Sequence, residues 1–210
     1  MLFLAVYSCS QNKGTNVNEP VHTIKKPEPL KPVEMVNWVE DQENGLLQQK
    51  TIDDLSFSAL YKPAQYMSIV ELHKMKVDID SGKFEQVQQS YKGMEYFTYK
   101  ISTDKTNDEL LKYKTSSSDE YYQRLEYYSF KAQNDFYLIA GKDSLPCKLF
   151  HFERTFGLTP VLTFVLGFQG ERKPAQDLTL VYNDKIFSNG LIKLNFGLES
   201  LSSIPAVTIK

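Results

Sequence analysis

The stretch CKLFHFERTFGLTPVLTFVLGF, residues 147–168, decides the fold of this 210-residue chain. Large apolar residues recur there at alternate positions on both sides of the turn sequence GLTP, residues 157–160, with one interruption at Arg154. These positions are Phe150, Phe152, Phe156, Leu162, Phe164, Leu166 and Phe168. Alternation of this kind is typical of a strand with one buried face, because successive side chains point to opposite faces. The stretch therefore predicts two neighbouring antiparallel strands.

The chain on both sides of this stretch, from Asn134 to the end, has further strand patterns separated by turn residues. Strands are expected over residues 135–141, 178–182 and 191–196, with a turn over 142–146 and a segment over 204–210 that can close a sheet edge. Several short strands at this spacing favour an antiparallel sheet or a sandwich in the C-terminal half.

The N-terminal and middle parts combine strand and helix patterns. Strands are expected over residues 55–61 and 96–101, and helices over 63–75 and the following DIDSGKFEQVQQSYKG stretch. Two capping boxes, Thr106 to Glu109 and Ser117 to Glu120, predict two more helix starts. With two to four helices ahead of the sheet-rich half, the predicted fold class is α+β.

The helix expected after Ser117 carries a tyrosine-rich surface. By the 3.6-residue period, Tyr121, Leu125 and Tyr128 share one stripe and should face the core. Tyr122 and Tyr127 fall on the flanks of this stripe. Two interpretations stay open for them: rings lying over the helix edge with their hydroxyls in water, or rings that stack on a ligand.

Composition limits the classes of function. Hydrophobic residues make up 41% of the chain, which suffices for a packed core, and the formal net charge is only −2. A chain this evenly balanced shows no basic excess of the kind that nucleic-acid binding requires. No apolar run reaches the 18 residues of a membrane-spanning helix.

The first residues suggest how the chain is located. Residues 1–8 form a short apolar segment that is typical of the end of a signal peptide, and VYSC, residues 6–9, resembles a bacterial lipobox with Cys9 as the acylated residue. Tyr7 is atypical of that motif. The apolar segment is short and lacks a preceding basic residue, and a portion upstream of Met1 would supply both features. The alternative is an ordinary core cysteine behind a trimmed start.

The next segment has the composition of a tether. Residues 9–35 are polar and contain four prolines, so we expect a Pro-rich flexible spacer in extended polyproline II conformation. A Pro-rich ligand for a partner domain is the alternative. A single globular α+β domain is then expected over residues 36–210.

Motifs for metal, nucleotide or nucleophilic chemistry do not occur in the sequence. It contains no H-E-x-x-H, C-x-x-C, G-x-S-x-G or G-x-G-x-x-G, and DIDSGKFE departs from a calcium loop at its fifth, sixth and twelfth positions. No metal and no cofactor is therefore predicted.

The strongest polar cluster is HFERTFG. His151 and Glu153 should share one face of a strand, where an imidazole beside a carboxylate can do acid–base work or simply form the solvated side of a sheet. Arg154 should lie near the strand end, within reach of a carboxylate or an aromatic ring. Cys147, on the same strand, is expected to be a packed residue rather than a nucleophile.

Several strings together carry a resemblance. The lipobox-like start, YYQRLEYYSF, LPCKLFHFERTFGLTPVLTFVLGF and LVYNDKIFSNGLIKLNF resemble a group of Bacteroidetes-type bacterial lipoproteins to which no activity is assigned. The resemblance implies a location in the Gram-negative cell envelope, on the periplasmic side or at the cell surface, and supplies no catalytic residues. The expected function is a lipid-anchored, non-enzymatic binding or scaffolding role with an envelope partner. The alternative is an envelope hydrolase or other enzyme that uses His151 and Glu153.

Overall fold

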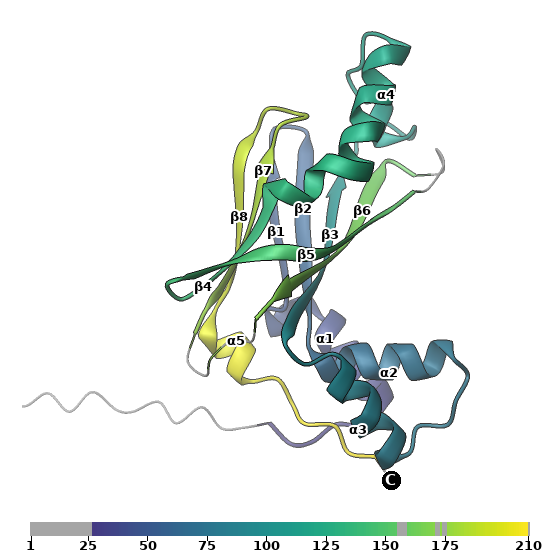
Figure 1. Ribbon diagram of the computed structural model, residues 1–210, viewed down its shortest axis with the longest axis vertical. Helices are drawn as coiled ribbons and strands as arrows, with labels where there is room; N and C mark the ends of the chain where they lie inside the picture. The colour runs from purple at the N-terminus through teal and green to yellow at the C-terminus, as the bar shows by residue number, and fades with distance from the viewer. Residues whose placement is uncertain (1–26, 155–158, 171–172, 174–175, 210) are drawn as a thin grey trace, which may run out of the picture.

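Eight antiparallel strands form one sheet that curls into a nearly closed barrel in the computed structural model, which describes residues 27–154, 159–170, 173 and 176–209 (Figure 1). The strand order is β1-β2-β3-β6-β5-β4-β7-β8. The two outermost strands, β1 and β8, lie in contact, and no hydrogen-bonded ladder joins them among the described residues. The predicted α+β class with an antiparallel sheet is confirmed, and the sheet curls into a nearly closed barrel instead of forming a sandwich.

The strands of the sheet come from all parts of the folded chain. The strands are β1 Leu47–Ile52, β2 Leu55–Lys62, β3 Met94–Ser102, β4 Phe136–Ala140, β5 Asp143–Glu153, β6 Val161–Gln169, β7 Leu178–Asp184 and β8 Gly190–Phe196. The helices are α1 Pro32–Glu40, α2 Ala64–Lys74, α3 Ser81–Ser90, α4 Ser118–Glu126 and α5 Leu198–Ser202. A π-helical turn, Tyr127–Lys131, follows α4, and short 3₁₀ turns cover Gln42–Asn44, Leu110–Lys112 and Ala132–Asp135.

Two parts of the predicted layout are wrong. The sheet is not confined to the C-terminal half, because β1, β2 and β3 come from residues 47–102, and one helix, α5, follows the last strand. The sequence of β1, LQQKTI, gave no strand prediction because polar residues lie on both faces of this edge strand. The expected turn over residues 142–146 is also wrong: Ala140 pairs with Asp143, so a two-residue turn with Gly141 at φ 62° joins β4 to β5.

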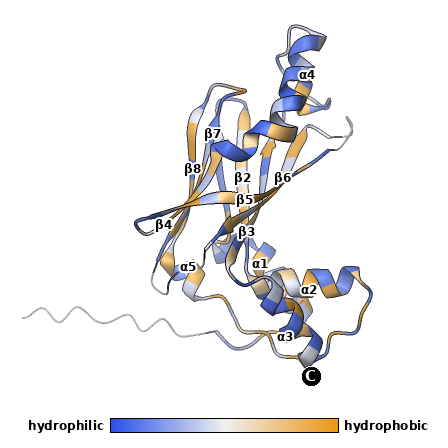
Figure 2. Ribbon diagram, in the orientation of Figure 1, coloured by the Kyte–Doolittle hydropathy of each residue, from blue (hydrophilic) through white to orange (hydrophobic). Residues whose placement is uncertain are grey.

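The two strands of residues 147–168 lie at the centre of the sheet. β6 pairs with both β3 and β5, and the residues of its predicted apolar face, Leu162, Phe164, Leu166 and Phe168, are all buried. β2 alternates strictly between buried and half-buried residues. Figure 2 shows the resulting change of hydropathy along the strands. The turn between β5 and β6 lies partly outside the described residues.

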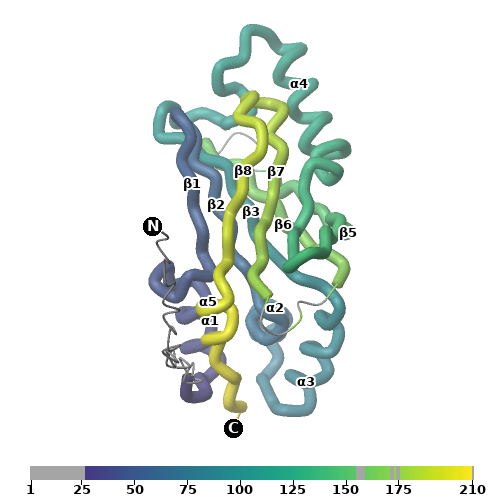
Figure 3. Tube along the Cα trace, turned by 90° about the vertical axis from the view of Figure 1, so that its left-hand side faces the viewer, coloured from purple at the N-terminus to yellow at the C-terminus, as the bar shows by residue number. Residues whose placement is uncertain are grey.

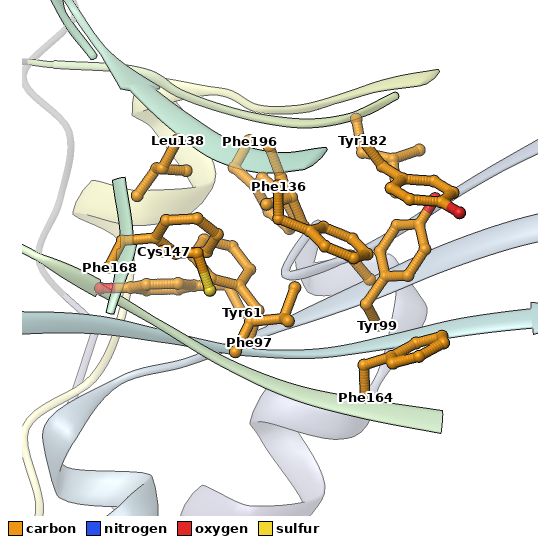
Figure 4. Close-up of a cluster of buried hydrophobic side chains, with 14 of the residues drawn as sticks. Tyr61, Phe97, Tyr99, Phe136, Leu138, Cys147, Phe164, Phe168, Tyr182 and Phe196 are labelled. Atoms are coloured by element: carbon orange, nitrogen blue, oxygen red, sulfur yellow. The ribbon is translucent and has the colours of Figure 1, made fainter. Parts of the chain in front are cut away.

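Aromatic side chains fill the interior of the barrel (Figure 4). Phe136 stacks on Tyr182 with ring centroids 4.4 Å apart, and Tyr99 meets both rings edge to face. Nearer the other end, Phe97 lies edge to face with Phe168. Each of these rings removes a large apolar area from water, so the barrel interior is the hydrophobic core of the molecule.

Four helices gather at one end of the barrel, which we call the helix end: α1, α2, α3 and α5 (Figure 1). Leu30 forms a parallel bridge with Val207 there, donating from its backbone N–H to the carbonyl of Ala206 at 2.8 Å. Met35 in α1 is fully buried. The predicted boundary between tether and domain at residue 36 is therefore too late, because a proline at the first turn starts a helix whose apolar residues belong to the core.

Helix α4 projects beyond the opposite end of the barrel, which we call the loop end (Figures 1 and 3). Ser117 caps it as predicted, with its hydroxyl accepting from the backbone N–H of Glu120 at 3.2 Å. Tyr128 is fully buried and Tyr122 is exposed, in agreement with the predicted stripe. The capping box at Thr106 does not start an α-helix; only the turn Leu110–Lys112 follows, because Leu110 and Leu111 are both buried side by side.

Candidate functional site

The residues singled out from the sequence lie on the outside of the barrel. His151 and Glu153 share the outer face of β5, opposite Val165 and Thr163 of β6, and both are exposed. Phe150 lies on the other face and packs against the core. Neither His151 nor Glu153 lines the loop-end cavity or the hollow at the start of α4 that are described below.

Arg154 and Cys147 do not join these two residues in a site. The guanidinium of Arg154 interacts with the side chain of Tyr121 in α4. Cys147 is buried, and its thiol donates to the carbonyl of Leu149 at 3.1 Å. Burial raises the pKa of the Cys147 thiol to about 11, so at neutral pH this group is a neutral thiol. Cys9 lies outside the described residues.

Polar side chains concentrate instead around a cavity of about 200 Å³ at the loop end. Three segments that are far apart in sequence line it: residues 52–55 between β1 and β2, residues 113, 114 and 124 around the start of α4, and residues 186–189 between β7 and β8. We call it the loop-end cavity. Each of the three segments is held by one side chain that bonds several partners.

Asp54 holds the first segment. Its carboxylate accepts from the Tyr113 hydroxyl at 2.8 Å and from the Lys114 ammonium at 2.8 Å, and its carbonyl accepts from the Thr103 hydroxyl at 2.7 Å. The hydrogen bonds from Lys114 and then Tyr113 lower the pKa of this carboxyl group. Asp54 therefore ties the β1–β2 turn to the segment that leads into α4.

Arg124, whose side chain is buried, fixes the second segment. Its side chain is 8% exposed, and Nη1 donates to the carbonyl of Tyr113 at 2.6 Å while Nη2 donates to Glu120 at 2.6 Å. The guanidinium also lies over the ring of Phe187, 5.2 Å from its centroid. A buried guanidinium needs this many partners, and here they connect α4 to the β7–β8 loop.

Asp184 holds the third segment at the end of β7. It is 1% exposed, and its carboxylate accepts from the backbone N–H groups of Ile186 and Phe187 at 3.2 Å each. It also accepts from the backbone N–H and the side-chain amide of Asn189, at 3.2 and 2.7 Å. One buried carboxylate thus fixes the whole β7–β8 loop in one conformation.

Backbone strain gathers at the same place. Of the four described non-glycine residues with positive φ, three line the loop-end cavity: Asp53 at 50°, Lys114 at 54° and Ser188 at 60°. A left-handed conformation costs a residue with a side chain about 1–2 kcal/mol, and such strain concentrates at functional sites. The loop-end cavity is therefore preorganised by hydrogen bonds that hold the strained turns.

The chemistry of the loop-end cavity suits binding. Lys114 pairs with Asp54 within the lining, Arg124 pairs with Glu120 beside it, and the apolar side chains of Ile52 and Phe187 mix there with hydroxyl and amide groups. Within the described residues, no group of three or more His, Cys, Asp or Glu side chains is placed to hold a metal ion. Among these same residues, no helix combines the length and apolar character needed to cross a bilayer.

The residues around the loop-end cavity could not be predicted from the sequence, for a physical reason. Asp54, Arg124 and Asp184 come from three distant segments, and each looks like an ordinary polar residue in its local sequence. Glu120 and Arg124 have the four-residue spacing of a helical ion pair, but that spacing does not reveal that the arginine is buried.

Comparison with known proteins adds little. No protein-family model matches the chain, and no curated protein matches it. Among solved structures, a DUF4426 family protein from Pseudomonas aeruginosa PAO1 is similar, with 8% sequence identity and a TM-score of 0.33 over 72% of this chain and 91% of that one. A TM-score of this size does not establish a common fold, so the likeness says nothing about the function of this chain.

Proposed function

We propose that this chain is a lipid-anchored protein of the Gram-negative cell envelope, acylated at Cys9, and that its folded part binds another envelope component without catalysing a reaction. The observation that carries the proposal is the separation of two ends. The chain enters the fold at the helix end, where Leu30 forms a bridge with Val207. The β1–β2 and β7–β8 turns, whose residues line the loop-end cavity, lie at the other end of the barrel (Figure 3).

This separation has a direct consequence for an anchored protein. Residues 10–29 connect Cys9 to Leu30, and twenty residues span at most about 70 Å when fully extended. A bilayer that holds the acyl chains would lie beyond the helix end. The loop-end cavity and α4 would then face away from that bilayer, toward whatever the protein binds.

Acylation supplies the free energy of attachment in this proposal. Each buried CH₂ contributes about 0.8 kcal/mol, so one chain binds reversibly and two or more chains hold a folded domain stably at the bilayer. The lipobox-like VYSC sequence and the Pro-rich composition of the following residues are the sequence features that support this assignment.

The enzyme alternative has no structural observation in its favour. An acid–base pair needs a cavity in which substrate can meet both groups and a third polar group nearby. His151 and Glu153 lie on an exposed sheet face instead, and we therefore do not propose catalysis by these residues.

Metabolic labelling with an alkyne fatty acid tests the anchor. The chain has two cysteines, so Cys9→Ala and Cys147→Ala form a matched pair of variants. We expect label in the wild type and in Cys147→Ala, and none in Cys9→Ala, together with release of Cys9→Ala from the membrane fraction. Equal labelling of the two variants would contradict the proposal, as would an unlabelled wild type.

A further inference from the structure

A second hollow, of about 350 Å³, lies at the start of α4. It is lined by residues 112, 115–118, 121 and 122, and we call it the α4 hollow. Four of its seven lining residues carry serine or threonine hydroxyls and two are tyrosines. Its volume falls within the range of small-molecule sites, and its lining is far richer in hydroxyl groups than such sites usually are.

Tyr122 gives the α4 hollow an exposed aromatic wall. The residue is 64% exposed, and its ring meets Tyr121 edge to face with centroids 5.3 Å apart at 78°. Tyr121 is fixed in turn, because its hydroxyl donates to the buried Glu109 at 3.2 Å. The ring of Tyr122 is thus backed by a fixed neighbour and presents a flat apolar surface to solvent.

The hydroxyl groups of the α4 hollow retain hydrogen-bonding capacity. Thr115 donates to the carbonyl of Lys112 at 2.8 Å, Ser116 donates to Glu120 at 3.0 Å, and Ser117 accepts from the Glu120 N–H at 3.2 Å. A hydroxyl has one hydrogen to donate and two lone pairs to accept, so each of these groups has at least one position left. The α4 hollow can therefore donate to and accept from a ligand.

The charges around the α4 hollow disfavour an anion. A helix start attracts negative ligands, but here the first turn of α4 already carries Asp119 and Glu120. The Lys112 ammonium is paired with Asp108 at 3.2 Å, and Arg124 is paired with Glu120 at 2.6 Å. Lys112, the cation in the lining, and Arg124, on the next turn of α4, are thus both neutralised by carboxylates, which favours a neutral ligand.

We propose that the α4 hollow binds a neutral oligosaccharide of gluco-configured pyranose units. Such a sugar has an apolar face of axial C–H bonds, which stacks on the Tyr122 ring, and a rim of equatorial hydroxyls, which bond with the serine and threonine hydroxyls. The inference rests on the proposed binding role of the loop end and is independent of the lipid anchor. Of the two interpretations of Tyr122, a ring lying over the helix edge or a ring that stacks on a ligand, the proposal selects the second.

Saturation-transfer NMR on the full chain tests this site. The protein is the Cys9→Ala variant, so that no acyl chain is present, and the probes are chitotetraose and cellotetraose. Tyr122→Ala removes the stacking surface and Tyr122→Phe keeps it. Phe130→Ala removes another exposed ring, which lies on the π-helical turn after α4 and outside the α4 hollow. Thermal unfolding of all variants checks that the fold is unchanged, as expected for exposed rings.

We expect transfer to at least one probe, with affinity about tenfold weaker in Tyr122→Ala, given the usual contribution of an aromatic contact, and within about twofold of the parent in Tyr122→Phe and Phe130→Ala. Absence of transfer to both probes would overturn the proposal, as would equal binding by folded Tyr122→Ala. Fatty-acid labelling reports on the anchor separately, so failure of the sugar site and failure of the anchor give different results.

Discussion

Single polar side chains organise the loop end. Asp54, Arg124 and Asp184 each bond to several backbone or side-chain groups from a segment that has no regular structure of its own. Arg124 and Asp184 are buried, and a buried polar group left without partners costs more than the partnered group contributes, so these two residues in particular specify one loop conformation. None of the three could be identified from sequence, since their importance comes from contacts with distant segments and not from a local pattern.

Asp184 should be the most sensitive of these positions. Replacing Asp184 by Ala leaves the N–H groups of the β7–β8 loop without their acceptor, and we expect a loss of about 2–4 kcal/mol in the free energy of unfolding. Urea denaturation of the purified protein measures this loss in the free energy of unfolding. Asp143→Ala is the matched control at another strand end: its carboxylate is exposed and lies 3.8 Å from Lys173, so its loss should cost less than about 0.5 kcal/mol. Equal effects of the two substitutions would show that the loop is not held in this way.

At the scale of elements, local sequence patterns predicted most of the helices and strands. The period-2 alternation of β2 and β6 and the caps of α3 and α4 were sufficient because each signal lies within a few adjacent residues. Closure of the barrel could not be predicted, since it depends on which strands become neighbours. The edge strand β1 could not be predicted either, because polar residues lie on both of its faces and neither face is buried.

The π-helical turn after α4 also could not be predicted from the sequence patterns. Within Tyr127–Lys131, Tyr128 is fully buried in the barrel while Phe130 is 80% exposed. A π-helix has a wider turn than an α-helix, and the 3.6-residue period, which correctly places Tyr128 in the core, does not reveal this wider turn. Such turns are often found at functional sites, and here the turn connects the projecting α4 to the core.

Helix α4 should depend on Arg124 for its attachment to the barrel. Arg124→Ala removes the bonds to the Tyr113 carbonyl and Glu120, and we expect a loss of about 2–3 kcal/mol in the free energy of unfolding. Hydrogen exchange of the amides in residues 111–124 should then be at least about tenfold faster. Lys131→Ala, which removes an exposed pair with Glu126, is the control and should leave this exchange unchanged. Unchanged exchange in Arg124→Ala would contradict the role given to this residue.

At the scale of the whole molecule, hydrogen bonds from tyrosines to carboxylates recur throughout the fold. Tyr66 donates to Glu40 at 2.6 Å, Tyr127 donates to Asp135 at 2.8 Å, and Tyr91 donates to Glu71. Burial, followed by these hydrogen bonds, raises the pKa of all three phenols well above the ordinary value near 10. The folded state therefore requires protonated tyrosines.

This requirement predicts how stability depends on pH. A folded pKa above the unfolded value stabilises the protein below about pH 10, and that contribution is lost as the pH rises from the unfolded toward the folded pKa. The free energy of unfolding from urea denaturation should show no tyrosine-linked loss between pH 7 and 9 and should fall above about pH 10. Ionisation of these phenols near pH 10 in the folded protein, detected by absorbance at 295 nm, would contradict the assigned burial.

The arrangement of the two ends is the central claim of this account. The chain enters the fold at the helix end, the side on which we propose the lipid anchor, and the loop-end cavity and the α4 hollow lie at the opposite end. Energy transfer to an acceptor lipid in vesicles measures this orientation on the acylated protein. Gln86→Cys in α3 and Gln123→Cys in α4 provide matched exposed labelling positions, since Cys147 is buried. We predict strong transfer from position 86 and weak transfer from position 123; equal transfer, or stronger transfer from position 123, would contradict the account.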